Sequence, residues 1–465
     1  MAVESPLIYE RLRAAVTGDA AAIRCRIDLQ PAGGPDDKVF PPTYAGGVYA
    51  FEKRRVGDRE VSVVLLDSVQ SQANRLELAL QQAYDEGTLR FPLLLVDFSA
   101  AGIEGVQRIT TLEAPHRIAD AIFRDSEFKT TLFRDSDMGK RFAAARVENA
   151  TAMFELCPTA LIFGVWDSTG AAGGLGNKFA RALVSEIVGY DVVPGVRTSS
   201  RIDPLAIEKC KIYEHNDSTE QNKLWTVNEE EALKDKDGKP APFKRKSTGK
   251  GKAGKPSEIN HGNVTPDIVR YAERVNAPDP LKPSDISINY ALRSEDGDIS
   301  THSEVKKSDR TIRSGDIAVG GVTLSRAVQT TVLSLPALRR LRFPDEKGKQ
   351  TAARNDAART VLAALSLAAI TYQRKAGYFL RSRCDLVPFA DEVPFEIVTS
   401  ATNVGKCLVN AELACKLFEQ AVDEAKKNGM NWPAEEPIRL KPKNAFVQLV
   451  KRSRELAALE EEEDD

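Results

Sequence analysis

The residues best suited to chemistry lie in a glycine-rich segment near the middle of the chain. The apolar run from Pro158 to Gly170 predicts a buried strand, and the spacing of apolar residues from Phe179 to Gly189 predicts a helix. Three glycines and a lysine stand between them, namely Gly173, Gly174, Gly176 and Lys178. Because exposed N–H groups at a helix N-terminus attract anions, this arrangement suits phosphate, and Lys178 and Arg181 would add positive charge.

The spacing of this loop fits neither nucleotide-binding fingerprint. A P-loop requires Gly-Lys-Ser/Thr, but Asn177 precedes Lys178 and Phe179 follows it. A dinucleotide loop that began at Gly174 would need a third glycine where Phe179 stands. Phosphate contact and a tight turn that packs a helix against a sheet both remain open, whereas a mononucleotide enzyme is not indicated.

The composition of the chain excludes several classes of protein. The chain has 465 residues with 65 lysines and arginines against 67 acidic residues, so its net charge of -2 does not indicate a partner. Its six cysteines form no CxxC pair, which argues against a disulfide framework or a zinc site and favours the cytoplasm. We expect no signal peptide, and no membrane span because no run approaches ~20 apolar residues.

Catalytic patterns are sparse. The four histidines are scattered, and neither HExxH nor GxSxG occurs. Asp167 at a predicted strand end and Asp203 in a loop could bind a metal, but neither has a partner at ligand spacing. For Asp167, N-capping or a salt bridge is the favoured interpretation. The sequence therefore predicts no catalytic residue, no metal and no cofactor.

A second polar set follows an earlier strand. Val61–Leu66 predicts a strand, and the next residues predict a helix that Ser68 or Ser71 caps and that continues to about Tyr84. The first turns of this helix are densely polar, with Gln70, Gln72, Asn74 and Arg75. These side chains fit either a solvated helix face or contact with a sugar–phosphate backbone.

Other segments show clear patterns. They predict a helix within residues 1–20, a strand over Ala22–Leu29, a helical run to Arg342 that Pro336 breaks, a buried helix over Ala352–Tyr372, a strand over Tyr378–Leu380, a surface helix over Ala411–Asn428 and a disordered acidic tail over Glu460–Asp465. The run from Lys239 to Pro256 is basic and contains no acidic residue, so it predicts a flexible loop that either contacts nucleic acid or is a solvated linker.

Six motifs occur in order along the chain: Ser71–Glu77, Phe163–Gly170, Gly173–Gly176, Ser199–Pro204, Pro256–Asn263 and Thr330–Leu341. With them the chain resembles the backbone subunit of a type I CRISPR effector complex, in the branch called subtype I-G (formerly I-U) of the RAMP superfamily. The resemblance covers roughly residues 60–345.

The resemblance implies an α+β fold with an RNA-recognition-motif-like (ferredoxin-like) core, large thumb and web insertions, and extra helices. Copies of such a subunit polymerise along one CRISPR RNA, and the guide pairs with target DNA. A separate helicase-nuclease cuts the DNA, so the subunit is a non-catalytic scaffold. The implied partners are CRISPR RNA, target DNA through the guide, further copies of the chain and other Cascade subunits.

The residues expected to bind RNA are polar or basic residues, most of them in or beside the matched motifs: Asn74, Arg75, Lys178, Arg181, Ser199, Ser200, Arg201, His261, Asn263 and Arg326, with Gly173, Gly174 and Gly176 as a phosphate loop. Two other functions stay open. One is a type III-like backbone subunit that cleaves RNA with a metal at Asp203 or Asp316. The other is an α/β enzyme that binds a phosphorylated small ligand.

The expected organisation has four parts. Residues 1–208 form the first part of the core with a helical insertion, and residues 209–300 form a polar insertion with the lysine-rich loop. Residues 301–400 complete the core, and residues 401–465 form a C-terminal helical region with the acidic tail.

Overall fold

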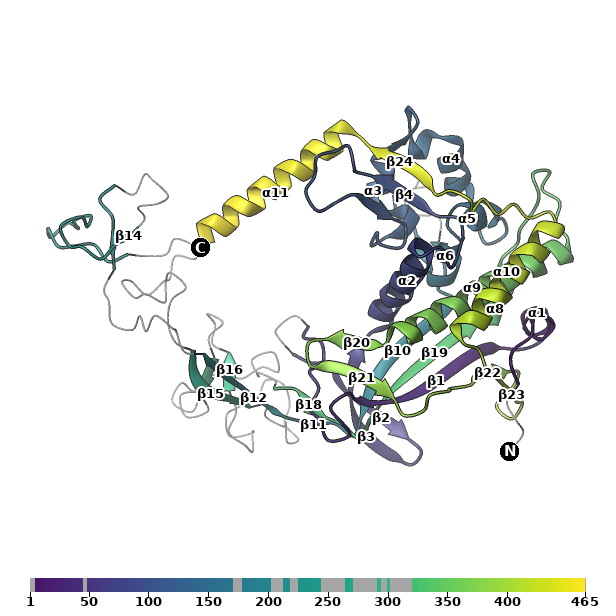
Figure 1. Cartoon of the computed structure of the whole chain (residues 1–465), viewed down its shortest axis with the longest axis horizontal. Helices are drawn as coiled ribbons and strands as arrows, with labels where there is room; N and C mark the ends of the chain where they lie inside the picture. The colour runs from purple at the N-terminus through teal and green to yellow at the C-terminus, as the bar shows by residue number, and fades with distance from the viewer. Residues whose placement is uncertain are drawn as a thin grey trace. The chain divides into compact units, whose positions relative to one another are not determined.

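The computed structural model describes residues 5–44, 48–169, 178–201, 212–217, 225–243, 264–270, 291–293, 299–301 and 320–464 (Figure 1). The predictions on Gly173, Gly174, Gly176, Asp203, His261, Asn263 and Asp316 lie outside these residues, as does most of the lysine-rich run. The chain divides into two compact units. The first comprises Met1–Gly195 and Gly321–Val447, and the second comprises Val196–Gly320 and Gln448–Asp465.

The first unit is built on a nine-stranded sheet in which neighbouring strands are antiparallel. Along the sheet the main path runs β2-β3-β10-β19-β1-β21-β20, and β22 and β23 extend it beside the start of β1. Its strands are β1 (Ala22–Pro31), β2 (Phe51–Val56), β3 (Arg59–Asp67), β10 (Leu183–Tyr190), β19 (Arg326–Ser334), β20 (Tyr378–Arg381), β21 (Cys384–Pro388), β22 (Phe395–Val398) and β23 (Val404–Cys407).

Four central strands have a distinctive order. Numbered as they occur along the chain, β1, β10, β19 and β21 lie side by side in the order fourth, first, third, second. The helix α2 (Val69–Asp85) lies in the connection from β1 to β10, and α9 (Ala352–Ala376) lies in the connection from β19 to β21. Helices and strands are thus mixed around an antiparallel sheet, which confirms the α+β class.

The helices α2 and α9 lie on the same face of this sheet (Figure 1). The alternation of β1 turns Ile23, Cys25, Ile27 and Leu29 into the core, while Arg24, Arg26 and Asp28 are exposed. The long helix α9 is buried along most of its length and packs against α2, α1 (Tyr9–Thr17) and α10 (Ala411–Lys427). The predicted helices of the N-terminus, of Ala352–Tyr372 and of Ala411–Asn428 are confirmed.

A second sheet of the first unit joins distant parts of the chain. Its order is β5-β4-β24-β6-β7, and its C-terminal strand pairs in parallel with β4. The strands are β4 (Leu94–Asp97), β5 (Arg108–Thr110), β6 (Ser126–Phe128), β7 (Thr131–Leu132) and β24 (Ile438–Pro442). The helices between β5 and β10 and before α9 are short: α3 (Ala121–Arg124), α4 (Asp137–Ala144), α5 (Thr151–Leu156), α6 (Pro158–Phe163) and α8 (Leu335–Arg340), with the 3₁₀ turns η1 (Arg117–Ala119) and η2 (Phe133–Asp135).

The remaining elements are small pairs of strands and one terminal helix. The paired strands are β8 (Val165–Trp166) with β9 (Lys178–Phe179), β11 (Val193–Pro194) with β18 (Val322–Thr323), β12 (Val196–Arg201) with β15 (Val264–Arg270), β13 (Tyr213–Glu214) with β14 (Trp225–Thr226), and β16 (Ala291–Arg293) with β17 (Ile299–Thr301). The helix α11 spans Asn444–Asp464.

Four sequence expectations are wrong. The predicted strand from Pro158 is helix α6 followed by the two-residue strand β8, and the predicted helix from Phe179 is strand β9 followed by β10. The helical run before Arg342 is strand β19, and only α8 is helical. Residues four apart share a face in a strand as well as in a helix, so Leu183 and Ile187 fitted both. The acidic tail is helical to Asp464 rather than disordered.

Candidate nucleic-acid interface

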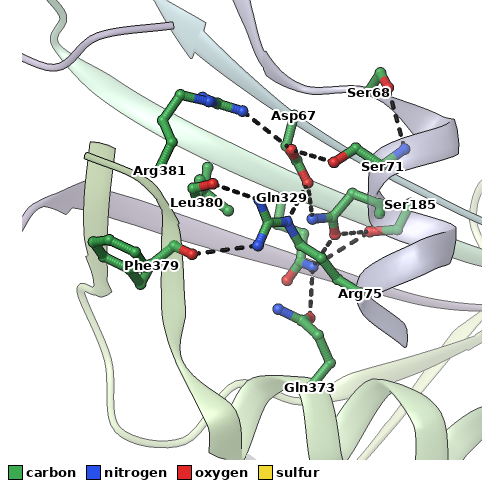
Figure 2. Close-up of polar contacts among 11 residues, drawn as sticks. Asp67, Ser68, Ser71, Arg75, Ser185, Gln329, Gln373, Phe379, Leu380 and Arg381 are labelled. Carbon is green, nitrogen blue, oxygen red and sulfur yellow. Dashed lines mark hydrogen bonds and ion pairs between the residues drawn. The ribbon is translucent and has the colours of Figure 1, made fainter. Parts of the chain in front are cut away.

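The polar start of α2 builds a buried network around Asp67 (Figure 2). The Asp67 carboxylate is fully buried and accepts hydrogen bonds from Ser71 Oγ at 2.8 Å and Gln72 Nε2 at 2.6 Å. It also pairs with Arg75 Nε at 2.9 Å and Arg381 Nη2 at 3.4 Å. We call these five residues the Asp67 network. A buried carboxylate with this many donors is stable because its lost hydration is replaced.

Arg75 also donates hydrogen bonds to the backbone of β20. Its Nη1 and Nη2 donate to the carbonyl oxygens of Phe379 at 3.3 Å and Leu380 at 2.6 Å on β20 (Figure 2). Arg75 therefore ties the N-terminal half of α2 to an edge strand of the sheet. The neighbouring Asn74 is exposed on α2. Of these two predicted RNA contacts, Asn74 is exposed to solvent, whereas Arg75 is bonded to Asp67 and to the β20 backbone.

The Asp67 network continues across the sheet as a chain of amides and hydroxyls. The amide oxygen of Gln72 accepts hydrogen bonds from Ser185 Oγ at 2.9 Å and Gln329 Nε2 at 2.8 Å. Gln329 also donates to Gln373 Oε1 at 3.1 Å on α9. This series of hydrogen bonds thus joins α2, β10, β19 and α9. Such satisfied networks fix the relative positions of the elements they join.

A second group of basic side chains surrounds residues 163–169, where α6 ends and β8 begins. The group comprises Arg117, Arg124, Arg134, Lys178 and Arg181, and we call it the basic cluster. Arg117 forms a two-pronged ion pair with Glu77 at 2.6 and 2.7 Å and donates to the Gly164 carbonyl at 3.0 Å. Arg181 Nε donates to the Phe163 carbonyl at 3.1 Å.

Gly164 lets these chains approach closely. It has a φ of +82°, and a Cβ at this position would lie 3.0 Å from the Arg181 amide nitrogen and 3.1 Å from the Phe179 carbonyl oxygen. Glycine adopts such a left-handed conformation without steric cost. The end of α6 and the strand β9 can therefore lie side by side, which brings Arg181 beside Arg117.

Two of these groups have shifted acidities. Burial lowers the pKa of the Arg181 guanidinium, and the neighbouring charge of Arg117 lowers it further. Burial raises the pKa of the Glu77 carboxyl, although its ion pair with Arg117 opposes the shift. Arg117 and Arg181 thus lie close enough for their positive charges to repel each other.

The other side of the cluster is organised by Asp167. Arg134 Nη2 donates to Asp167 Oδ1 at 2.8 Å, and Thr169 donates to the same oxygen through its backbone N–H at 3.1 Å. Arg124 Nη1 and Arg134 Nη2 both donate to Thr169 Oγ1, at 3.2 and 3.0 Å. Burial opposes ionisation, but these hydrogen bonds outweigh it and hold the pKa of Asp167 below its ordinary value. Asp167 is a salt-bridge partner, as the sequence favoured.

Lys178 is exposed, and it stands opposite Trp166 in the β8–β9 pair. Its Nζ lies 5.7 Å from the centroid of the indole ring. Of the predicted contacts, Lys178 and Arg181 are thus brought together, but on strands and loops rather than on the first turn of a helix.

The other predicted residues lie apart from this group or have no described side chain. Arg326 begins β19, is half-exposed, and lies near Asp28 at 3.8 Å and over the Tyr190 ring. Ser199, Ser200 and Arg201 belong to β12 in the second unit. Sequence reasoning missed Arg117, Arg124 and Arg134. Each is isolated in the sequence, and the positive φ of Arg117, 52°, becomes visible only in the structure.

The described residues contain no group of three or more His, Cys, Asp and Glu side chains that could hold a metal ion. None of the helices described is long and apolar enough to span a membrane. The five described cysteines form no disulfide with one another, and four of them are buried.

Comparison with known proteins identifies part of the chain. No curated protein matches it. Residues 23–194 match the model of a protein family described as CRISPR-associated protein GSU0053 (Cas_GSU0053). The match includes α2, the basic cluster and the central strands β1, β3 and β10. The resemblance to a CRISPR-associated family is thereby confirmed, and over residues 23–194 this chain is similar to the Cas_GSU0053 family.

Proposed function

We propose that this protein is a non-catalytic, RNA-binding backbone subunit of a type I CRISPR effector complex of subtype I-G. The observation that carries the proposal is the match of residues 23–194 to a CRISPR-associated family. Several copies would polymerise along one CRISPR RNA, and the guide would recognise target DNA by base pairing. Other Cascade subunits would process the guide and cut the target.

The strand order supports the fold that this role requires. A ferredoxin-like sheet has two helical crossovers and places its four strands in the order fourth, first, third, second. The strands β1, β10, β19 and β21 have that order, with α2 and α9 in the two crossovers. We therefore propose an RNA-recognition-motif-like core in which β2 and β3 extend one edge and residues 196–320 of the second unit are an insertion between β10 and β19.

The basic cluster supports contact with RNA of any sequence. A subunit that binds every guide must contact phosphate and sugar rather than base edges. Lys178 is exposed, and Arg124 and Arg134 are half-buried where they both donate to Thr169. Of these two arginines, Arg134 has Asp167 as a described ion-pair partner. We propose Lys178, Arg124 and Arg134 as phosphate contacts. Asn74, Arg181, Ser199, Ser200, Arg201, His261, Asn263 and Arg326 remain proposed contacts, and Arg75 is proposed to act by positioning β20. The described cysteines, which form no disulfide with one another, favour the cytoplasm.

The test is to express the chain with and without a CRISPR array and to purify it under native conditions. Its particle mass is measured by light scattering, and any bound RNA is extracted and sequenced. We expect a large particle that holds repeat-derived RNA of defined length. A nucleic-acid-free monomer in both preparations, also when the partner subunits are coexpressed, would contradict the proposal.

A further inference from the structure

Trp166 is a large apolar side chain that the fold leaves in solvent. It is 57% exposed on the two-residue strand β8, and the fold gains little from burying it. The indole stands opposite Lys178, whose ammonium lies 5.7 Å from the ring centroid. The basic hairpin, as we call β8 and β9, therefore presents an exposed aromatic ring with a cation over one of its faces.

Further basic side chains gather just after the strand that carries this ring. Arg134 and Arg124 converge on Thr169, three residues after Trp166 in the sequence. The carboxylate that bonds to Arg134 here is Asp167, which is buried and therefore does not face an incoming ligand. A nucleic acid uses both features, because its phosphates are attracted to the cations and its bases can stack on the ring. A purely acidic partner would leave the ring unused, and a purely apolar partner would leave the charge unused.

The second exposed tryptophan lies in the opposite electrostatic setting. Trp225 is 41% exposed on β14, and its partner across the β13–β14 pair is Glu214. The described residues 212–217 and 225–243 carry seven acidic and three basic side chains. We call β13 and β14 the acidic hairpin. Trp432, the third tryptophan, is 4% exposed and belongs to the core.

We propose that Trp166 is a stacking platform for an unpaired nucleobase of bound RNA, and that Lys178 contacts a phosphate of the same strand. Proteins that bind single-stranded nucleic acid without sequence preference combine aromatic faces with basic grooves, because every base has a π-face and every nucleotide a charge. In the basic hairpin the ring and the ammonium are 5.7 Å apart, close enough to contact the base and the phosphate of the same nucleotide. This inference rests on the proposed RNA-binding function and adds the residue that holds a base.

Stacking and phosphate contact predict different signatures. Removal of the ring lowers the affinity for RNA without changing its dependence on salt, because no phosphate contact is lost. Removal of the ammonium lowers the salt slope by about 0.7 for a single strand. The two contributions can therefore be separated by Trp166→Ala and Lys178→Ala.

The experiment uses the full chain, stripped of nucleic acid at high salt, with a labelled oligouridylate and an abasic oligomer of equal length. We expect Trp166→Ala to weaken oligouridylate binding about tenfold at every salt concentration and to leave abasic binding unchanged. Trp166→Phe keeps a π-face and should bind nearly as tightly as the wild type. Trp225→Ala is the matched control and should bind as the wild type does. Melting temperatures identify any variant that fails to fold.

A second measurement does not depend on removing the ring. In the Trp225→Phe variant, Trp166 is the exposed tryptophan, and its fluorescence should be quenched by oligouridylate but not by the abasic oligomer. Unchanged fluorescence, or equal losses of affinity for both oligomers in Trp166→Ala, would overturn the proposal. So would a Trp166→Ala variant with wild-type affinity whose particle mass is altered, because the ring would then join copies of the chain. A wild-type chain that binds neither oligomer would contradict the RNA-binding function itself.

Discussion

The basic and acidic hairpins contain the same kind of residue in opposite surroundings. Each is a pair of two-residue strands. Each exposes a tryptophan and places a charged side chain directly opposite it. The partner of Trp166 is Lys178, whereas the partner of Trp225 is Glu214. Exposure of an aromatic ring alone therefore does not identify a nucleic-acid contact. The charge opposite the ring decides whether a phosphate chain is attracted or repelled.

The two hairpins are also held differently. Near the basic hairpin, Arg117 pairs with the buried Glu77 and donates to the Gly164 carbonyl. In the acidic hairpin, Tyr213 donates to the exposed Glu229 at 2.7 Å. A buried ion pair is costly to break because one charge stays behind without water, whereas an exposed partner is rehydrated. The same deletion of a polar contact should thus have unequal effects.

The largest effect is expected from Arg117→Ala. The variant leaves the Glu77 carboxylate buried and without its guanidinium, so the free energy of unfolding should fall by about 3–5 kcal/mol. The measurement is urea denaturation at neutral pH. Adding Glu77→Gln should recover part of the loss, because an amide is cheaper to bury than a carboxylate.

The matched change in the acidic hairpin is Tyr213→Phe. It removes one hydrogen bond to an exposed carboxylate, so it should lower the stability by only about 1 kcal/mol. Equal losses in the two variants would show that the two hairpins are anchored alike, and the comparison would fail.

Arg75→Ala tests whether a basic residue inside a satisfied network can also bind RNA. The variant removes one of the two guanidinium groups that bind Asp67, together with both donors to the β20 carbonyls, so the free energy of unfolding should fall by about 2–3 kcal/mol. RNA affinity should remain at the wild-type value at temperatures where the variant is folded. Asn74→Ala, one residue earlier and exposed, should leave stability unchanged. A lower salt slope for Arg75→Ala would return Arg75 to the RNA contacts.

Sequence patterns predicted the elements whose signals are local. The strand β1 alternates cleanly, α2 has a serine cap, and α9 is a long apolar segment without glycine or proline. The strands β10 and β19 were predicted as helices because their apolar positions recur at spacings that both structures share. Their hydrogen bonds go to each other and to β1 and β3, and these distant pairings cannot be read from either segment.

The candidate site was only half visible in the sequence. Lys178 and Arg181 were found through their glycine-rich neighbourhood, but their predicted helix does not exist. Arg134 and Arg117 were missed because they reach Asp167 and Gly164 from 33 and 47 residues away. For Arg75, the motif marked the residue but could not show its hydrogen bonds to the β20 carbonyls, which belong to residues 304 and 305 positions away.

Exchanging the charges of the hairpins tests the electrostatic half of the comparison. Lys178→Glu gives Trp166 an acidic partner like that of Trp225, so RNA affinity should fall on the order of tenfold at moderate salt, more than for Lys178→Ala. Glu214→Lys should leave affinity unchanged or raise it slightly, because the rest of that hairpin remains acidic. Both are measured by titration with oligouridylate at several salt concentrations. Equal effects of opposite sign would mean that both rings contact RNA.

The smallest effect concerns acid stability at the basic hairpin. Hydrogen bonds from Arg134 and Thr169 hold the pKa of Asp167 below its ordinary value of about 3.9. Ionised Asp167 therefore stabilises the fold above that value, and the contribution is lost as the pH falls through the lower, folded-state pKa. Asp167→Asn should lower the free energy of unfolding near neutrality, and the difference between this variant and the wild type should shrink as the pH falls below about 4.

Arg134→Gln should move the acid-induced loss of stability to higher pH, because it removes the guanidinium that lowers the pKa of Asp167. Urea midpoints as a function of pH measure both, and a difference for Asp167→Asn that stays constant down to about pH 2 would show that Asp167 acts through shape rather than charge.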